Sequence, residues 1–236
     1  MGNYLIKSID KGIYGEGSRA GSAAVFVKFA SCNLWDGRPI DRIKGKGSCA
    51  QWCDANFAGG EKYSGGELLL RINALSPPDD CERWCVLTGG EPALQIDLEL
   101  IKQLREYGWK ILLETNGTVD SDAVRSVDWL VVSPKRGGDV TVRGGDELHM
   151  MLSDGEDWLA QELLDFGHAR LWQYRYVLPI DPLNGTEVED THLHSKGTIK
   201  ITGVKEAYDK AVKRCIKFVE ENPAWRLSLQ IQKFLP

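Results

Sequence analysis

Three cysteines that stand close together are the residues of this chain whose type and spacing most clearly indicate chemistry. Cys32, Cys49 and Cys53 fall within residues 31–64, a stretch that is rich in glycine and polar residues and shows no helix or strand pattern. Three thiolates with no fourth cysteine close by suit an iron–sulfur cluster with one open iron better than a structural zinc site, whose four positions are filled. We therefore expect these cysteines to be metal ligands in a cluster-binding loop, with the open iron able to bind an external ligand.

Two other interpretations of the three cysteines stay open. One is a zinc site that takes its fourth ligand from a histidine, and the chain offers His149, His168, His192 and His194. The other is that the thiols are unrelated and buried, since a buried cysteine packs as a small apolar side chain. Their shared polar, glycine-rich setting favours a metal site over unrelated packing.

The remaining cysteines indicate packing. Cys215 falls on the apolar face of a predicted helix, and Cys85 begins a predicted buried strand, so we expect both in the core. Cys81 and Cys85 are reserve ligands in case the loop cysteines hold no cluster.

Composition and the N-terminal residues indicate a broad class. With 42% hydrophobic and 27% charged residues the chain is expected to be globular, and a net charge of -5 argues against a broad basic groove for nucleic acid. The sequence has neither a signal-peptide stretch nor a run of about 18 apolar residues. We expect a cytoplasmic protein with reduced thiols and no membrane segment.

Polar and glycine-containing motifs follow three predicted strands. Gly89-Gly90-Glu91-Pro92 comes after one apolar run, Glu114-Thr115-Asn116-Gly117 ends the next, and Ser133-Pro134-Lys135 ends a third. In folds built on parallel strands, residues just past the carboxyl ends of the strands form the binding site. Glycine also lets a backbone approach a ligand closely.

The scaffold predicted for these motifs alternates strands with helices. Apolar runs predict strands at 23–29, 84–88, 110–114, 129–133, 148–152, 171–178 and 226–230. Helical spacing predicts helices at 67–75, after a cap at Asp97, at 157–166 and across 208–219. About six such units indicate an α/β fold with a parallel sheet, a partial (βα)6-type TIM-like barrel. We expect one domain over residues 1–236, with an irregular insertion at 181–203 in which 186–188 pairs with 198–200.

Taken together, the motifs resemble those of the radical S-adenosylmethionine (SAM) superfamily. The three cysteines follow the first predicted parallel strand, and the two glycine-containing motifs at 89–92 and 114–117 follow the second and third. The wide cysteine spacing and the start Cys32-Asn33-Leu34-Trp35 narrow the resemblance to the 7-carboxy-7-deazaguanine synthase family, some of whose members carry an enlarged cluster loop. The resemblance spans nearly the whole chain, from Gly15-Glu16-Gly17 to Trp225-Arg226-Leu227-Ser228.

The resemblance implies an enzyme with a radical SAM core, a [4Fe–4S] cluster, SAM, a small-molecule substrate, an external electron donor such as flavodoxin, and a homodimer. The three thiolates would hold three irons and SAM would chelate the fourth, so that reduction yields a 5′-deoxyadenosyl radical. The residues implied to bind SAM are Gly89, Gly90, Glu91, Glu114, Asn116, Ser133 and Lys135. The residues implied to bind substrate are Tyr14, Glu16, Lys28, Asp54 and Gln232, of which Glu16 and Lys28 are also implied to be catalytic.

The chain departs from the family pattern where the substrate should bind. Tyr14 stands where the family commonly has glutamine, Lys28 where it has arginine, and Gln232 where it often has histidine. Ala55 replaces a threonine whose hydroxyl binds magnesium in some members, so we expect little stimulation by Mg²⁺. Leu178-Pro179-Ile180-Asp181 stands where the family has Gln-Pro-Met-Asp.

Three hypotheses about function follow. The first is a 7-carboxy-7-deazaguanine synthase, which contracts the ring of 6-carboxytetrahydropterin with loss of ammonia in 7-deazapurine and queuosine biosynthesis. The second is a diverged paralogue that performs a radical isomerisation on another substrate, such as a hypermodified nucleobase or an amino-acid conjugate. The third is a zinc- or cluster-binding module without turnover.

Overall fold

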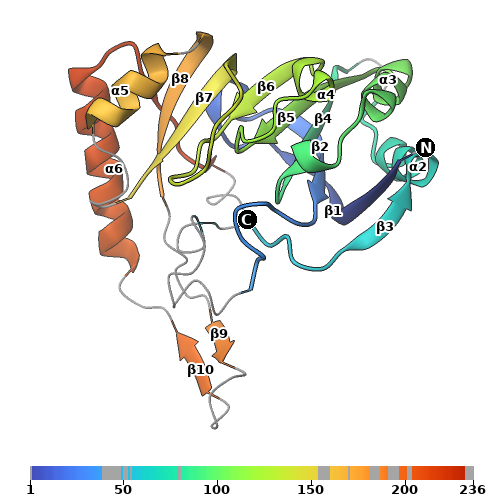
Figure 1. The fold of residues 1–236 in the computed structure, drawn as a ribbon, viewed down its shortest axis with the longest axis horizontal. Coiled ribbons are helices and arrows are strands. Elements are labelled where there is room, and N and C mark those ends of the chain that lie inside the picture. The colour runs from blue at the N-terminus through green and yellow to red at the C-terminus, as the bar shows by residue number, and fades with distance from the viewer. Residues whose placement is uncertain are drawn as a thin grey trace.

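The main feature of the computed structural model is a nine-stranded sheet in the order β11-β8-β7-β6-β5-β4-β2-β1-β3 (Figure 1). The structure describes residues 2–38, 49, 53, 55–78, 81–153, 160–169, 171–180, 187–190, 197–200 and 204–231. Asp54, Gln232, His192 and His194 therefore lie outside the described residues.

Successive strands of this sheet are parallel and follow one another in chain order. They are β2 (Ala23–Phe29), β4 (Arg83–Gly89), β5 (Trp109–Thr115), β6 (Trp129–Val132), β7 (Gly144–Leu152) and β8 (Leu171–Pro179). The short β11 (Arg226–Leu227) pairs parallel with β8. Their carboxyl ends meet along one edge of the sheet, as the partial-barrel prediction requires, and the predicted α/β class is confirmed.

Two strands at the far edge of the sheet were not predicted. β1 (Asn3–Ile13) pairs antiparallel with β2, and β3 (Glu61–Ser64) pairs antiparallel with β1. Within β1, Tyr4 and Ile6 are buried, whereas its second half is half-buried or exposed. β3 is four residues long and has no buried residue. Neither segment therefore carries the apolar run that marks a central strand.

The helices include α2 (Gly65–Asn73), α3 (Leu98–Glu106), α4 (Asp122–Arg125), α5 (Ala160–His168) and α6 (Val204–Glu221), with short turns η1 (Gly17–Arg19) and η2 (Pro92–Leu94). The predicted cap is confirmed, because the Asp97 carboxylate accepts a hydrogen bond from the Leu100 amide at 2.8 Å. α2 begins with a capping box formed by Ser64 and Glu67, two residues before the predicted start. No helix in the described part of the chain is long and apolar enough to cross a membrane.

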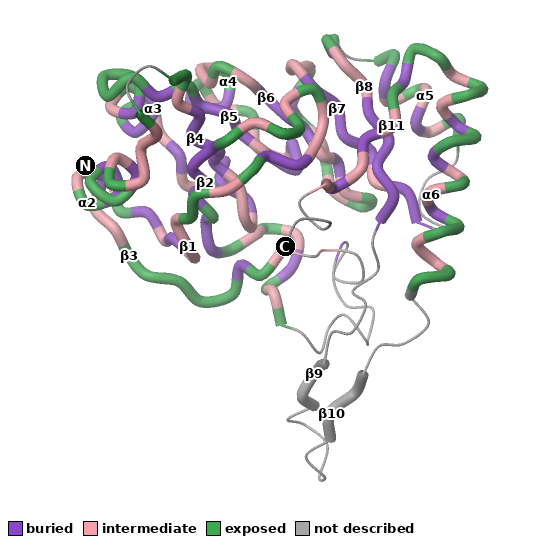
Figure 2. The backbone as a smooth tube through the Cα atoms, turned by 180° about the vertical axis from the view of Figure 1, so that it is seen from behind, coloured by how far each residue is buried: buried purple, intermediate pink, exposed green. Residues whose placement is uncertain are grey.

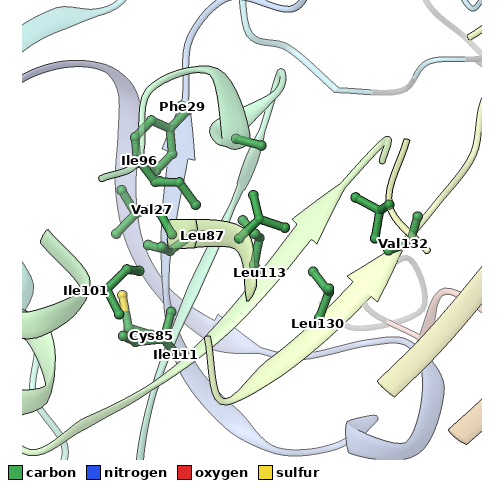
Figure 3. Packing of buried hydrophobic residues seen from close by; sticks show 14 of the residues in the cluster. Val27, Phe29, Cys85, Leu87, Ile96, Ile101, Ile111, Leu113, Leu130 and Val132 are labelled. Carbon is green, nitrogen blue, oxygen red and sulfur yellow. The ribbon is translucent and has the colours of Figure 1, made fainter. Parts of the chain in front are cut away.

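The apolar core lies between the sheet and the helices. On β2 the side chains of Val25, Val27 and Phe29 belong to this core, and Figure 3 shows Val27 beside Leu87 of β4 and Phe29 beside Ile96. The helices keep their exposed faces outward, whereas the strands are mostly buried (Figure 2). Because side chains alternate along a strand, the residues between these core positions point to the opposite face, which carries the site.

Several boundaries differ from the prediction. β7 begins at Gly144 rather than 148. Its first half contains the polar residues Asp146 and Glu147, so it lacks the apolar run from which a strand would be predicted. β11 ends at Leu227 rather than 230. The connection 133–143 between β6 and β7 contains no helix, and the Thr141 amide instead donates to the Gly117 carbonyl at 2.9 Å. The predicted hairpin is confirmed as β9 (Glu187–Asp190) and β10 (Gly197–Lys200), with Val188 opposite Ile199.

Candidate active site

A cavity of about 200 Å³ lies at the carboxyl ends of the parallel strands. It brings together most of the residues that the sequence singles out. The predicted site residues that line it are Glu16, Cys32, Cys49, Cys53, Gly89, Gly90, Glu114, Asn116, Ser133 and Lys135. Segments as far apart as the loop after β1 and the connection after β6 therefore contribute to one site.

The three loop cysteines meet at one wall of this cavity. Cys49 is buried, Cys32 and Cys53 are half-buried, and Trp35 and Phe57 pack around them with ring centroids 5.4 Å apart. A hydrogen bond with the Cys53 thiol, followed by burial, raises the pKa of Cys49 far above its ordinary value. Burial is also the main cause that raises the pKa of the Cys32 thiol. Binding of a metal group here must therefore displace thiol protons, and the charge of the metal would supply the driving force.

A single zinc ion is the alternative occupant of these cysteines. Among the described residues, no three His, Cys, Asp or Glu side chains are arranged to hold one metal ion. His149 is engaged with two carboxylates, and His168 is exposed at the end of α5. Three thiols that converge on one cavity wall suit a larger cluster, whose irons each take one sulfur.

Gly89 and Gly90 form a turn that is pressed against the segment leading to Cys32. The Gly90 amide donates to the Phe29 carbonyl at 2.9 Å, and the Glu91 amide donates to the Ser31 carbonyl at 2.8 Å. A Cβ on Gly90 would lie 1.9 Å from the Ser31 oxygen, and Gly89 has a φ of +113°. These glycines are thus required by their own chain, in addition to the close ligand approach expected of them.

Glu91 holds two strand-end loops together. Its carboxylate is 0% exposed and accepts hydrogen bonds from the Ala93 amide at 3.0 Å, the Thr115 hydroxyl at 2.7 Å and the Asn116 amide at 2.7 Å. Burial raises the pKa of Glu91, while these donors act in the opposite direction. The side chain is not among the residues that line the cavity. The structure thus places Glu91 behind the cavity wall, where it joins the loop after β4 to the loop after β5.

The role of Glu91 predicts the effect of an isosteric change. In Glu91→Gln an amide nitrogen replaces one oxygen and faces an N–H or O–H donor, because both carboxylate oxygens accept hydrogen bonds. We expect the free energy of unfolding to fall by about 1–3 kcal/mol, the usual cost of an unsatisfied buried group. Chemical denaturation measures this. Glu99→Gln on the exposed face of α3 should change it by less than about 0.5 kcal/mol; equal effects of the two changes would contradict the assigned role.

A second polar link ties the cluster loop to the end of β5. The Asn116 side-chain amide donates to the Asn33 side-chain oxygen at 3.0 Å, and Asn33 in turn donates to the Thr118 hydroxyl at 2.8 Å. Near the end of β6, the Lys135 ammonium donates to the Ser133 hydroxyl at 2.7 Å. The predicted ligand-binding residues Asn116, Ser133 and Lys135 therefore sit on fixed loops at the cavity wall.

Two carboxylates, those of Glu114 and Glu16, line the cavity. Glu114 of β5 accepts from the Tyr14 hydroxyl at 2.8 Å and from the Thr88 hydroxyl at 2.5 Å. Burial, then the nearby charge of Glu16, raises the pKa of Glu114. The Glu16 carboxylate accepts from the Gln230 side-chain amide at 2.7 Å. This part of the cavity can accept hydrogen bonds from a ligand that is rich in N–H groups.

The sequence did not lead us to predict Glu147 as a site residue, and it indicated His149 only as an alternative zinc ligand. His149 lines the cavity, and its imidazole lies between Glu16 and Glu147. One signal was present, since Glu147 and His149 alternate with the apolar residues Leu148 and Met150 along β7. A buried strand with ionisable residues on one face indicates that this face borders a site.

Of the predicted substrate-binding residues that the structure describes, Glu16 lines the cavity, whereas Tyr14 and Lys28 do not. Tyr14 is 3% exposed and stacks on Phe26 at 6.3 Å, and it is not among the residues that line the cavity. Lys28 is exposed, lies beside Thr88 in the strand register, and also stays outside that lining. Glu16 does line the cavity, and so does Ala55.

Comparisons with known proteins agree with the geometry. No family model matches the chain. The chain is 33% identical to the 7-carboxy-7-deazaguanine synthase of Burkholderia multivorans over 98% of each protein. It is 35% identical to the enzyme of the same name from Bradyrhizobium diazoefficiens, over 99% of this chain and 98% of that one. The crystal structure of QueE from Escherichia coli covers 97% of this chain and 94% of its own, with a TM-score of 0.65 and 21% identity, and supports the fold.

Proposed function

The chain belongs to the 7-carboxy-7-deazaguanine synthase family, and we propose on this premise that it converts 6-carboxytetrahydropterin into 7-carboxy-7-deazaguanine with loss of ammonia. The observation that carries the proposal is the convergence of three thiols and three strand-end loops on one cavity, in a chain that matches these synthases over nearly its full length. It is an enzyme of the radical SAM kind. Such activity needs reduced thiols, so we propose the cytoplasm as its compartment.

The donors present fit the cofactors that the family implies. Cys32, Cys49 and Cys53 would hold three irons of a [4Fe–4S] cluster, and their thiolates are the soft ligands that such clusters take. The fourth iron would be left for SAM, which the loops at Gly89–Gly90 and Ser133–Lys135 would hold. When bound, cluster and SAM together supply a carbon-centred radical that starts the rearrangement.

The chain's own residues bind and orient the ligands. Glu16 presents carboxylate oxygens to the N–H groups of a heterocyclic substrate, and Glu114 offers its carboxylate to SAM. Lys135 offers a positive charge to a carboxylate, and the Ser133 hydroxyl fixes its ammonium group. The apolar side chains of Leu34, Phe57 and Ile180 line the remaining wall and exclude water. A homodimer and an external reductant such as flavodoxin complete the proposal, as the family resemblance implies.

The hypothesis of a diverged paralogue receives limited support from the structure. Of the substituted positions, Tyr14 and Lys28 lie outside the cavity lining, so their replacement need not alter the substrate. Among the departures whose side chains the structure describes, Ala55 and Ile180 line the cavity. The hypothesis of a binding module without turnover is less well supported, because the relatives that match over nearly the full length are named as synthases.

Turnover with the pterin tests the proposed function. Anaerobically reconstituted and reduced protein is incubated with SAM and 6-carboxytetrahydropterin, and 7-carboxy-7-deazaguanine is measured by mass spectrometry. We expect this product to form with 5′-deoxyadenosine. Brisk SAM cleavage without the deazaguanine would favour the diverged paralogue, and zinc-loaded protein that cleaves no SAM would favour the binding module.

Ala55 predicts a weak response to magnesium. A methyl group offers no oxygen ligand, so Mg²⁺ should change wild-type turnover by less than about twofold. Ala55→Thr restores a hydroxyl at a position that lines the cavity, and turnover of this variant should rise with Mg²⁺. Turnover rates of both proteins, measured with Mg²⁺ and with a chelator, test this prediction. Strong magnesium activation of the wild type would show that other residues supply the ligand.

A further inference from the structure

A histidine held between two carboxylates lies beside the proposed substrate site. His149 is 1% exposed, and its Nε2 lies 2.7 Å from a carboxylate oxygen of Glu147. Its Nδ1 lies 3.4 Å from a carboxylate oxygen of Glu16. Neutral imidazole has one N–H, whereas both nitrogens here face an acceptor, so the arrangement favours the imidazolium form.

Glu147 holds His149 in place and is itself held by several hydrogen bonds. Its carboxylate is 0% exposed and also accepts from the Ser18 amide at 3.2 Å, the Ser18 hydroxyl and the Trp129 indole at 2.9 Å. Burial alone would raise the pKa of Glu147, but the bond to His149, its charge and the other donors together lower it. Glu147 is therefore an ionised group that fixes the imidazole ring from the interior.

Glu16 lies on the cavity side of the histidine. Besides the contact with His149, its carboxylate accepts from the Gln230 amide at 2.7 Å. The loop that carries Glu16 lies directly against Glu147. A Cβ on Gly17 would lie only 1.8 Å from the Glu147 carboxylate, and Gly17 also has a φ of +60°, so this position requires glycine. The Gly17 amide also donates to the Ser228 hydroxyl at 2.9 Å. Glu16 thus has one defined position at the cavity.

We propose that His149 is a positioning residue that keeps Glu16 charged and aimed into the cavity, where Glu16 accepts hydrogen bonds from the N–H groups of the substrate heterocycle. The inference rests on the proposed function for the identity of the substrate. The arrangement itself rests on the contacts of Glu16, Glu147 and His149 alone. With one positive and two negative charges, the group leaves one negative charge for the ligand side.

The charge of His149 has a defined pH range. The groups that face it are Glu147 on its own strand, Glu16 after β1, Glu114 on β5 and the Tyr176 ring on β8, whose centroid lies 5.4 Å away. Burial lowers the pKa of His149, but Glu147 and Glu16 raise it to about 9. The imidazolium is therefore present at neutral pH and is lost as the pH rises through about 9.

The test compares His149→Gln with His168→Gln, which alters the exposed histidine at the end of α5. We expect His149→Gln to raise the KM for the pterin by roughly tenfold or more, as expected when a charged positioning contact is lost. The wild-type KM should rise above about pH 9, and the variant should lack this break. His168→Gln should behave as the wild type. An unchanged KM in His149→Gln beside active wild type would overturn the inference and leave the proposed function intact.

A second readout needs neither cofactors nor turnover. Histidine titration by NMR in the cofactor-free protein should show one imidazole that stays protonated above pH 8, and it should be absent in His149→Gln. Glu16→Gln should lower the pKa of this imidazole, because one of its two carboxylate partners is lost. This variant also serves if His149→Gln does not fold. A His149 that titrates at an ordinary value would refute the arrangement, whereas a wild type that fails to convert the pterin while His149 titrates as expected would refute the proposed function and the substrate role inferred from it.

Discussion

Cys49→Ala is expected to abolish cluster binding and SAM cleavage. Cys49 is the buried member of the three thiols, and it shares a hydrogen bond with Cys53. Without it two thiolates remain, which leaves a second iron without a protein ligand. Iron content after anaerobic reconstitution should fall from roughly four per chain to less than about one.

Cys215→Ala is the matched control for this experiment. Cys215 is 0% exposed, lies on α6 and does not line the cavity. The variant should keep its iron and its SAM cleavage, at a cost in stability of about 1 kcal/mol for the lost core atom. A full cluster in Cys49→Ala would show that the ligand set is wrong.

Gly90→Ala is expected to have the second large effect. The added Cβ would meet the Ser31 carbonyl oxygen at 1.9 Å, and the neighbouring backbone is fixed by hydrogen bonds to Phe29 and Ser31. The clash between the added Cβ and Ser31 can be relieved only if the segment that carries Cys32 shifts. We expect a loss of about 3 kcal/mol or more in the free energy of unfolding, measured by denaturation, and weaker cluster binding.

Gly66→Ala provides the comparison, because nothing lies within 4 Å of its added Cβ and the residue is in the first turn of α2. This change should be neutral or should stabilise the protein by about 0.5–1 kcal/mol, since alanine favours the helix. If Gly90→Ala were as stable as Gly66→Ala, the close contact between the turn and Ser31 would be ruled out.

The sheet could be predicted to the extent that its strands are buried on both faces. β4 and β5 carry near-continuous apolar runs, so their position and their parallel pairing follow from the pattern. β1 and β3 could not be found in the same way, because most of β1 is half-buried or exposed and the short edge strand β3 has no buried residue. The connection between β6 and β7 has no helix, and the hydrogen bond between the Thr141 amide and the Gly117 carbonyl helps to hold it in place.

The site could be predicted where it depends on strand ends and not where it depends on side-chain partners. The rule for parallel strands correctly brings the thiol loop, Asn116 and Lys135 to one cavity. It does not reveal that Glu91 turns inward to bind the loop after β5, since that choice depends on the local backbone. The contact between His149 and Glu16 likewise joins segments that are distant in sequence, and only the folded sheet brings them together.

The three thiols at the cavity wall are proposed to hold a cluster whose open iron binds SAM. Electron paramagnetic resonance of the reduced, reconstituted protein tests this proposal directly, with spectra recorded before and after SAM is added. We expect a cluster signal that changes shape on addition of SAM in the wild type and is absent in Cys49→Ala. A wild-type signal that SAM leaves unchanged, or a protein that takes up one zinc ion and no iron, would contradict it.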